Sequence, residues 1–289
     1  MQVTVIGIFG PTASGKSLVG EAVAERLGGE VVSADAMQVY RGLPILTNQS
    51  PARLLAIWPL EKEASVGEYA PLAHAEIDRL LADGRTPVVV GGTGLYFRAA
   101  LAELDLPPAP VPGARERWSA AYDADPAAAH ARLQKLDPGA AASVHENDKR
   151  RVVRALELAE AGASLRPAED RLWAEHTRRP TLIVGLDPPK HELERRIVER
   201  TRAMFDAGVQ DEVRAALAGP VSRTARKTLG LDEVATLPRE QAIEAIVVRT
   251  RRYSAYQRKW MRRIPGLVIV ESADDIVALA RARERLPRR

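Results

Sequence analysis

Short apolar runs alternate with segments of helical periodicity in the first third of the chain. Residues 3–9 and 87–90 are continuous apolar runs rich in β-branched side chains, as buried parallel strands usually are. Residues 30–33 have a similar character, while apolar positions recur at helical spacing over residues 18–27 and 70–81. Because strands that alternate with helices favour a parallel sheet covered by helices, we expect an α/β fold.

The pattern changes at a proline-rich segment, residues 106–113. The chain is then rich in alanine and shows no convincing strand, so we predict a helical insertion over residues 106–178. The remaining parts, residues 1–105 and 179–289, are expected to form one α/β core. The strands predicted in its second part are residues 181–186 and 268–270, with a charged helix from about residue 191.

The composition excludes several classes of protein. Of the 289 residues, 46% are hydrophobic and 28% are charged, which is ordinary for globular proteins and unlike disordered ones. No apolar run reaches the roughly 18 residues that cross a bilayer, and the N-terminal residues do not predict a signal peptide. The absence of cysteine excludes disulfides, thiolate zinc sites, iron–sulfur clusters and a cysteine nucleophile. We therefore expect a cytoplasmic protein without membrane spans.

Basic residues gather at two places, although the net charge is only +4. The stretch Arg249–Arg263 holds seven basic residues and no acidic one, and Arg154 follows the run Lys149–Arg151. Such clusters suit a polyanionic partner, whose binding releases counterions, and they equally suit a solvated helix face. Trp260, inside the first stretch, could stack on a nucleobase or pack in the core.

The most specific motif lies between the first predicted strand and the first predicted helix. It matches G-x-x-x-x-G-K-[ST], the phosphate-binding P-loop, and occurs in the strand–helix context that this motif requires. Backbone N–H groups and the helix N-terminus bind phosphate there, the lysine neutralises the outer phosphates, and the final hydroxyl binds Mg²⁺. The residues expected to bind phosphate are Gly10, Pro11, Thr12, Ala13, Ser14, Gly15, Lys16 and Ser17.

Polar residues also follow the next two predicted strands. Asp35 and Gln38 come after residues 30–33, and the glycine-rich segment Gly91–Tyr96 with Thr93 comes after residues 87–90. The carboxyl ends of parallel strands face the ligand crevice, so we expect these side chains to point toward the P-loop. A lone aspartate after a strand is also common as a helix cap, which leaves a structural role for Asp35 open.

The ordered set of segments resembles the signatures of the tRNA dimethylallyltransferase (isopentenyltransferase) family. Gly10–Ser17, Asp35–Tyr40 and Gly91–Tyr96 occur in that family's order and at comparable distances. Asn147–Glu157 and Thr250–Arg262 extend the similarity along most of the chain.

The resemblance implies a P-loop NTPase-like parallel sheet core and a defined reaction. A dimethylallyl group passes from dimethylallyl diphosphate to N6 of adenosine-37 in tRNA, and diphosphate is released. In the family the P-loop holds diphosphate in place of ATP, and the resemblance implies Mg²⁺ bound by Ser17. The partners are therefore tRNA and dimethylallyl diphosphate, and we expect a monomer.

The resemblance also implies roles for single residues. Asp35 takes the N6 proton, and Thr93 contacts Asp35 or the leaving group. Lys16 stabilises the departing diphosphate, as does a basic residue at Lys227 or the adjacent Arg226. The residues expected to contact tRNA are Asp35, Ala36, Met37 and Gln38 at the site, with Gln38 holding the flipped-out adenine, and Arg150, Arg151 and Arg154 in the helical insertion.

Three alternatives remain. Transfer to free AMP, ADP or ATP uses a similar core, but a mononucleotide needs no helical insertion with a basic cluster. A P-loop nucleotide kinase would show a second apolar strand ending in a metal-binding aspartate, which is not obvious here. A divergent tRNA-binding paralogue with weak activity is the third, because the loop at residues 50–59 is short and lacks the paired histidines usual in the family.

Overall fold

The computed structural model describes residues 4–106, 111–165 and 171–284 and divides the chain into two compact units. The first unit comprises Met1–Glu103 and Leu172–Arg289, and the second comprises Leu104–Arg171. The expected strand start at residue 3 and the prolines of residues 107–110 lie outside the described residues. Within those three ranges, no helix combines the length and the apolar character needed to span a membrane.

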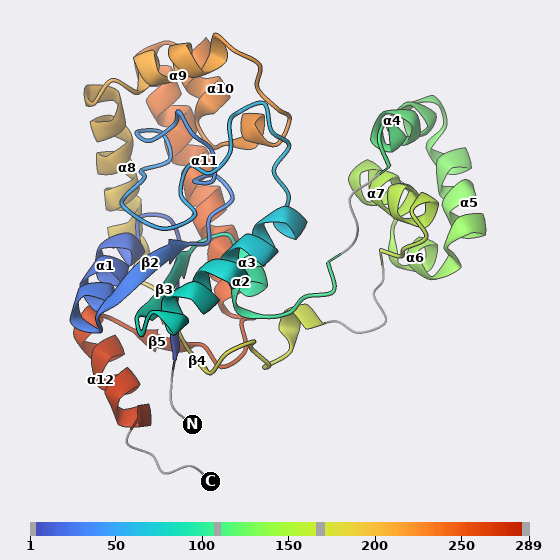
Figure 1. Ribbon diagram of the computed structural model, residues 1–289. Helices are drawn as coiled ribbons and strands as arrows, with labels where there is room; N and C mark the ends of the chain where they lie inside the picture. Colours follow the sequence, from blue (N-terminus) through green and yellow to red (C-terminus); the bar gives the residue numbers. More distant parts are fainter. Residues whose placement is uncertain (1–3, 107–110, 166–170, 285–289) are drawn as a thin grey trace. The chain divides into compact units, whose positions relative to one another are not determined.

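A parallel sheet forms the centre of the first unit (Figure 1). Its described strands are β1 (Val5–Phe9), β2 (Gly29–Ser33), β3 (Thr86–Gly91), β4 (Thr181–Leu186) and β5 (Val268–Val270). They lie in the order β2-β3-β1-β4-β5, with every neighbouring pair parallel. This arrangement confirms the predicted α/β fold. The predicted strand at residues 30–33 falls within β2, which begins one residue earlier at Gly29.

Helices cover both faces of this sheet (Figure 1). On one face α1 (Lys16–Arg26) and α12 (Ala273–Glu284) pack against β1, β3 and β4 through side chains such as Val23 and Ile276. On the other face α2 (Val66–Ala82) and α3 (Gly94–Leu101) contribute Tyr69, Ile77 and Phe97. Burial from both sides explains why β1, β3 and β4 are continuous apolar runs.

A further helical layer has its own apolar core. It consists of α8 (Lys190–Asp206), α9 (Val209–Leu217), the short turn η2 (Ala225–Lys227), α10 (Leu231–Thr236) and α11 (Arg239–Met261). Ile197, Phe205 and Ile246 of these helices pack with Leu43 and Leu46, which follow β2 in sequence. The segment after β2 therefore lies against α8 and α11.

The second unit is helical, with α4 (Ala114–Ala124), α5 (Pro126–Leu136), α6 (Pro138–Ser143) and α7 (Lys149–Glu160). The side chains of Asp125, Asp137 and Asp148 accept hydrogen bonds from the first turns of α5, α6 and α7, as N-caps do. Leu133 and Leu156 are fully buried in the core of this unit.

The segment after the second unit belongs to the first, although the sequence places it in the insertion. Arg98 on α3 is fully buried and donates from Nε to Leu172 O at 2.9 Å and from Nη2 to Ala174 O at 2.8 Å. Arg178 forms an ion pair with Asp78 at 2.5 Å. These contacts explain why the division falls at residue 172, whereas the sequence predicts residue 179.

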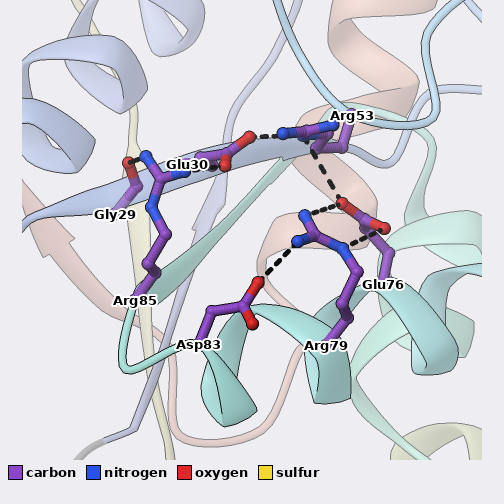
Figure 2. A network of polar contacts seen from close by, with 7 residues as sticks. All are labelled: Gly29, Glu30, Arg53, Glu76, Arg79, Asp83 and Arg85. Carbon is purple, nitrogen blue, oxygen red and sulfur yellow. Dashed lines mark hydrogen bonds and ion pairs between the residues drawn. The ribbon is translucent and has the colours of Figure 1, made fainter.

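The loop after β2 covers the open edge of this strand. The Arg53 N–H donates to Val31 O at 2.8 Å, and Arg53 O accepts from the Ser33 N–H at 2.9 Å. Figure 2 shows the Arg53 side chain in a network of ion pairs between side chains of β2, α2 and the turn after α2. Glu30 pairs there with both Arg53 and Arg85, and Arg53 lies 3.5 Å from Glu76.

This network makes stability depend on pH. The hydrogen bond from Arg53 lowers the pKa of Glu30 below its ordinary value of 4.5, and Arg53 and Arg85 favour the same charged form. A lowered folded-state pKa gives stability that is present above pH 4.5 and lost as pH falls through the folded value. Glu30→Gln should therefore lower the free energy of unfolding by at most about 1 kcal/mol at pH 7.

The measurement is the urea midpoint of Glu30→Gln and of the wild type at pH 7 and at pH 3. We expect the difference to shrink at pH 3, while Glu61→Gln, a change at an exposed glutamate, should alter neither midpoint. An equal difference at both pH values would contradict an electrostatic role for Glu30.

Candidate functional site

The turn between β1 and α1 has the backbone of an anion-binding loop. Gly15 is the N-cap of α1 at a φ of 88°, a left-handed conformation that glycine adopts without strain. No side chain in the described residues caps this helix, so the N–H groups of its first turn are free for an anion. Lys16 follows directly and donates to Pro11 O at 3.5 Å.

Two side chains hold this loop from outside. Gln257 of α11 is buried, accepts the Thr12 N–H at 2.7 Å and donates to Gly92 O at 2.9 Å. Arg196 of α8 donates to the carbonyl groups of Ala13 and Ser14 at 3.4 and 3.3 Å. The P-loop is therefore tied both to the segment after β3 and to the helical layer.

A pocket of about 680 Å³, part of it open to solvent, lies beside this loop. It brings together the P-loop, the segment after β2 and the helices α8 and α11. Its lining comprises Thr12, Lys16, Ser17, Asp35, Met37, Gln38, Leu46, Thr47, Asn48, Arg200, Thr201, Met204, Leu229, Ile246, Thr250, Tyr253 and Gln257.

Three charged groups dominate the electrostatics of the pocket. Burial lowers the pKa of Lys16 from 10.5 to about 8; Asp35 opposes this change and Arg200 adds to it. Burial also lowers the pKa of Arg200, again opposed by Asp35. Two cations facing one carboxylate leave the pocket positive at neutral pH, which favours an anionic ligand.

Asp35 lines the pocket, as expected from its place after β2. Its Oδ1 accepts the N–H of Met37 at 2.9 Å, while Oδ2 accepts no hydrogen bond from any residue that the structure describes. No helix follows directly, so the hydrogen bond stabilises a turn and does not cap a helix. One carboxylate oxygen is thus held by the fold, and the other remains available to a ligand.

Thr93 positions the Asp35 segment and does not itself line the pocket. Its hydroxyl accepts the Ala36 N–H at 3.2 Å and lies 3.4 Å from the hydroxyl of Tyr253. Burial, followed by the charge of Asp35, raises the pKa of Tyr253, so its phenol stays protonated and can donate. The expected contact of Thr93 with Asp35 thus runs through the next residue's backbone.

Gln38 lines the pocket with its amide already engaged. Its Nε2 donates to Thr47 O and Asn48 O, both at 3.1 Å, and its Oε1 accepts from the Ser33 hydroxyl at 3.0 Å. An amide has two N–H donors, so both are used within the protein. Any contact of Gln38 with a ligand must therefore use its oxygen or follow a rearrangement.

Lys227 is exposed on η2 and is not among the pocket residues, although the sequence places it against diphosphate. The adjacent Arg226 is also exposed and lies 3.9 Å from Asp232. The second cation in the pocket is Arg200, on the helix predicted from residue 191.

The predicted tRNA-contacting arginines lie on α7 of the second unit. Arg150 and Arg151 are exposed and form no ion pair with residues in the described ranges. Arg154 is half-buried and donates to Glu157 at 3.0 Å, so it stabilises a buried carboxylate inside its own unit. Lys149 is paired with Asp123, so Arg150 and Arg151 are, within the described residues, the unpaired cations of α7.

The donor set for Mg²⁺ is sparse. Over the described residues, no group of three or more His, Asp or Glu side chains could hold a metal ion. The Ser17 hydroxyl and the Asp35 carboxylate nevertheless line the same pocket. Mg²⁺ typically keeps several waters and binds through one or two protein oxygens together with substrate phosphates, so this set fits a metal that arrives with a diphosphate.

Comparison with known proteins gives matches along most of the chain. The family model described as IPP transferase matches residues 38–264. The tRNA dimethylallyltransferase of Streptomyces coelicolor is 43% identical over 277 residues, 90% of this chain and 88% of that protein. That of Anaeromyxobacter dehalogenans is 41% identical over 298 residues, 96% of this chain and 98% of that one.

Solved structures show the same likeness. A tRNA isopentenylpyrophosphate transferase from Bacillus halodurans has a TM-score of 0.69 and 29% identity, covering 98% of this chain and 96% of that one. A eukaryotic dimethylallyltransferase, described as acting on tRNA, has a TM-score of 0.76 over 98% of this chain and 77% of its own. At 24% identity, the second match is a likeness of fold.

Proposed function

Because the chain belongs to the IPP transferase family, we propose that it transfers a dimethylallyl group from dimethylallyl diphosphate to N6 of adenosine-37 in tRNA. The observation that carries this proposal is the joint placement of Lys16, Arg200 and Asp35 in one pocket beside the N-terminus of α1. Cations beside a helix N-terminus suit a diphosphate, and a carboxylate suits the amine that replaces it.

The cationic side of the pocket acts on the leaving group. As the bond from the allylic carbon to oxygen breaks, its electron pair leaves with the diphosphate. Lys16, Arg200 and the N–H groups at the start of α1 are positioned to stabilise this developing negative charge, which is usually the largest catalytic contribution. Mg²⁺, held by Ser17 together with phosphate oxygens, would supply further positive charge when bound.

The carboxylate side of the pocket acts on the nucleophile. N6 of adenine becomes acidic only as its bond to the allylic carbon forms, so it then needs a base within hydrogen-bond reach. The free oxygen of Asp35 accepts this proton. The hydrogen bond between Thr93 and the Ala36 N–H keeps the Asp35 segment in place. The oxygen of Gln38 accepts one hydrogen bond from Ser33, and its second lone pair can accept from the N–H edge of the adenine.

The test compares acceptors in one assay. Purified protein with dimethylallyl diphosphate and Mg²⁺ is given a tRNA, then AMP, ADP or ATP, and the nucleosides are analysed by mass spectrometry. We expect a dimethylallyl group on one adenosine of the tRNA and none on the mononucleotides. Modified AMP, ADP or ATP would favour the adenylate isopentenyltransferase, and phosphoryl transfer from ATP would favour a kinase. We place this reaction in the cytoplasm and expect a monomer to perform it.

The second unit supplies a prediction about salt. If Arg150 and Arg151 bind phosphates, the affinity for tRNA should fall steeply with salt, with a log–log slope of about −0.9 for each contact in duplex regions. Arg150→Ala combined with Arg151→Ala should therefore flatten the slope by up to about two. The measurement is a fluorescence titration of tRNA at several salt concentrations. An unchanged slope would make α7 a solvated helix face.

A further inference from the structure

A row of aromatic side chains leads along α11 away from the pocket. Tyr253 lines the pocket, and its ring centroid lies 6.5 Å from that of Tyr256. Tyr256 is in turn 6.5 Å from Trp260, which lies 4.9 Å from Trp173. All three distances are within the range of contacting aromatic rings. The row is thus continuous with the proposed reaction site.

Within this row, Tyr256 presents the open ring surface. This residue is 54% exposed, more than any other aromatic residue that the structure describes. Trp260 instead packs onto the backbone of Gly94, where a Cβ atom would come within 2.1 Å of the indole. The guanidinium of Arg263 covers Trp173 at 3.8 Å from its centroid. Of the two alternatives for Trp260, the structure favours packing.

Positive charge flanks the exposed ring. Arg252 and Lys259 lie four residues before and three residues after Tyr256, which places them on the same helix face. Both are exposed, and neither forms an ion pair with a residue that the structure describes, whereas Arg249 and Arg258 of the same helix are paired with carboxylates. An exposed ring between free cations is the arrangement by which proteins bind single-stranded nucleic acid.

We propose that Tyr256 stacks on the nucleobase next to the adenosine that enters the pocket, while Arg252 and Lys259 bind the adjoining phosphates. The inference rests on the proposed function. A nucleotide that flips out of a stack deprives its neighbour of a stacking partner, and this loss is part of the cost of flipping. The neighbour must lie just outside the pocket, where Tyr256 follows Tyr253 on α11. Stacking there replaces the lost partner.

The test uses an RNA stem–loop with the sequence of an anticodon arm, in which 2-aminopurine replaces each neighbour of the reactive adenosine in turn. Binding of the wild type should quench the fluorescence at one of the two positions. Tyr256→Ala and Tyr256→Leu should abolish the quenching and weaken binding by about 5- to 150-fold. Tyr256→Phe keeps a ring and should retain both. Leu72→Ala removes an exposed apolar side chain from α2 and should leave both unchanged.

The outcomes separate this inference from the proposed function. Dimethylallyl transfer by the wild type, together with unaltered quenching and affinity in Tyr256→Ala, would overturn the stacking role alone. Full recovery by Tyr256→Leu would also overturn it, because leucine restores apolar area without a ring. RNA binding with ring-dependent quenching but without dimethylallyl transfer would support the stacking role of Tyr256 and count against the proposed function. A wild type that binds no RNA would refute both.

Discussion

Replacing Asp35 by asparagine should lower single-turnover dimethylallyl transfer by about 10²- to 10⁴-fold, the usual range for loss of a general base. Asparagine keeps the shape of the side chain, and its oxygen can still accept the Met37 N–H that aspartate accepts at 2.9 Å. It cannot take the N6 proton. The fold and the affinity for tRNA should therefore be near those of the wild type, and the loss should lie in the chemical step.

Rapid-quench measurement with enzyme in excess over tRNA isolates that step. A thermal melt of the variant controls for folding, and the titration of a labelled tRNA controls for binding. Transfer at close to the wild-type rate would mean that Asp35 only stabilises its turn, because asparagine serves that purpose about as well. Recovery of the rate by added Mg²⁺ would instead mark Asp35 as a metal ligand.

Lys16→Ala should lower kcat/KM by about 10²-fold or more, since it removes a half-buried cation from the place where the diphosphate charge develops. The lysine also predicts a dependence on pH. Burial lowers its pKa to about 8, so in the free protein it is mostly charged at pH 7 and mostly neutral well above pH 8. The affinity for inorganic diphosphate should accordingly fall as pH rises through 8.

Calorimetric titration with Mg²⁺ and diphosphate from pH 7 to pH 9 measures this effect. Because diphosphate itself changes protonation with pH, the Lys16→Ala protein is the matched control, and the difference between the two proteins should narrow as pH rises. A difference that does not change with pH would show that the lysine stays charged throughout. Tight Mg²⁺-dependent binding of ATP without binding of dimethylallyl diphosphate would favour the kinase.

The local sequence pattern predicts an element or a site correctly where burial or a fixed loop geometry restricts which residues can occur there. The strand at residues 87–90 is apolar because helices cover both sheet faces, and it falls within β3. The P-loop is recognisable because its turn requires a glycine at position 15, and the structure has a left-handed residue there. Asp35 follows from the rule that ligands bind at the carboxyl ends of parallel strands.

Residues brought in by distant packing could not be predicted in this way. Arg200 reaches the pocket because α8 packs against α11, and nothing in its own neighbourhood distinguishes it from the other arginines of a charged helix. Tyr253 and Gln257 belong to a segment that carries the family resemblance, but their contacts with Thr93 and Thr12 span about 160 and 245 residues. The family resemblance implies that Lys227 contacts diphosphate, but this residue is exposed and lies outside the pocket lining, which contains Arg200.

The position of β1 in the middle of the sheet has a consequence for protein synthesis. Val5 of β1 is adjacent to Thr181 of β4, so this side of the strand stays unpaired until β4 has been made. The roughly 90 residues between β3 and β4 include the whole second unit and take about 5–20 s to translate. For that interval the nascent chain carries an apolar strand with an open edge, a template for pairing with other chains. The length of the insertion therefore sets how long the open edge of β1 can pair with other chains during synthesis.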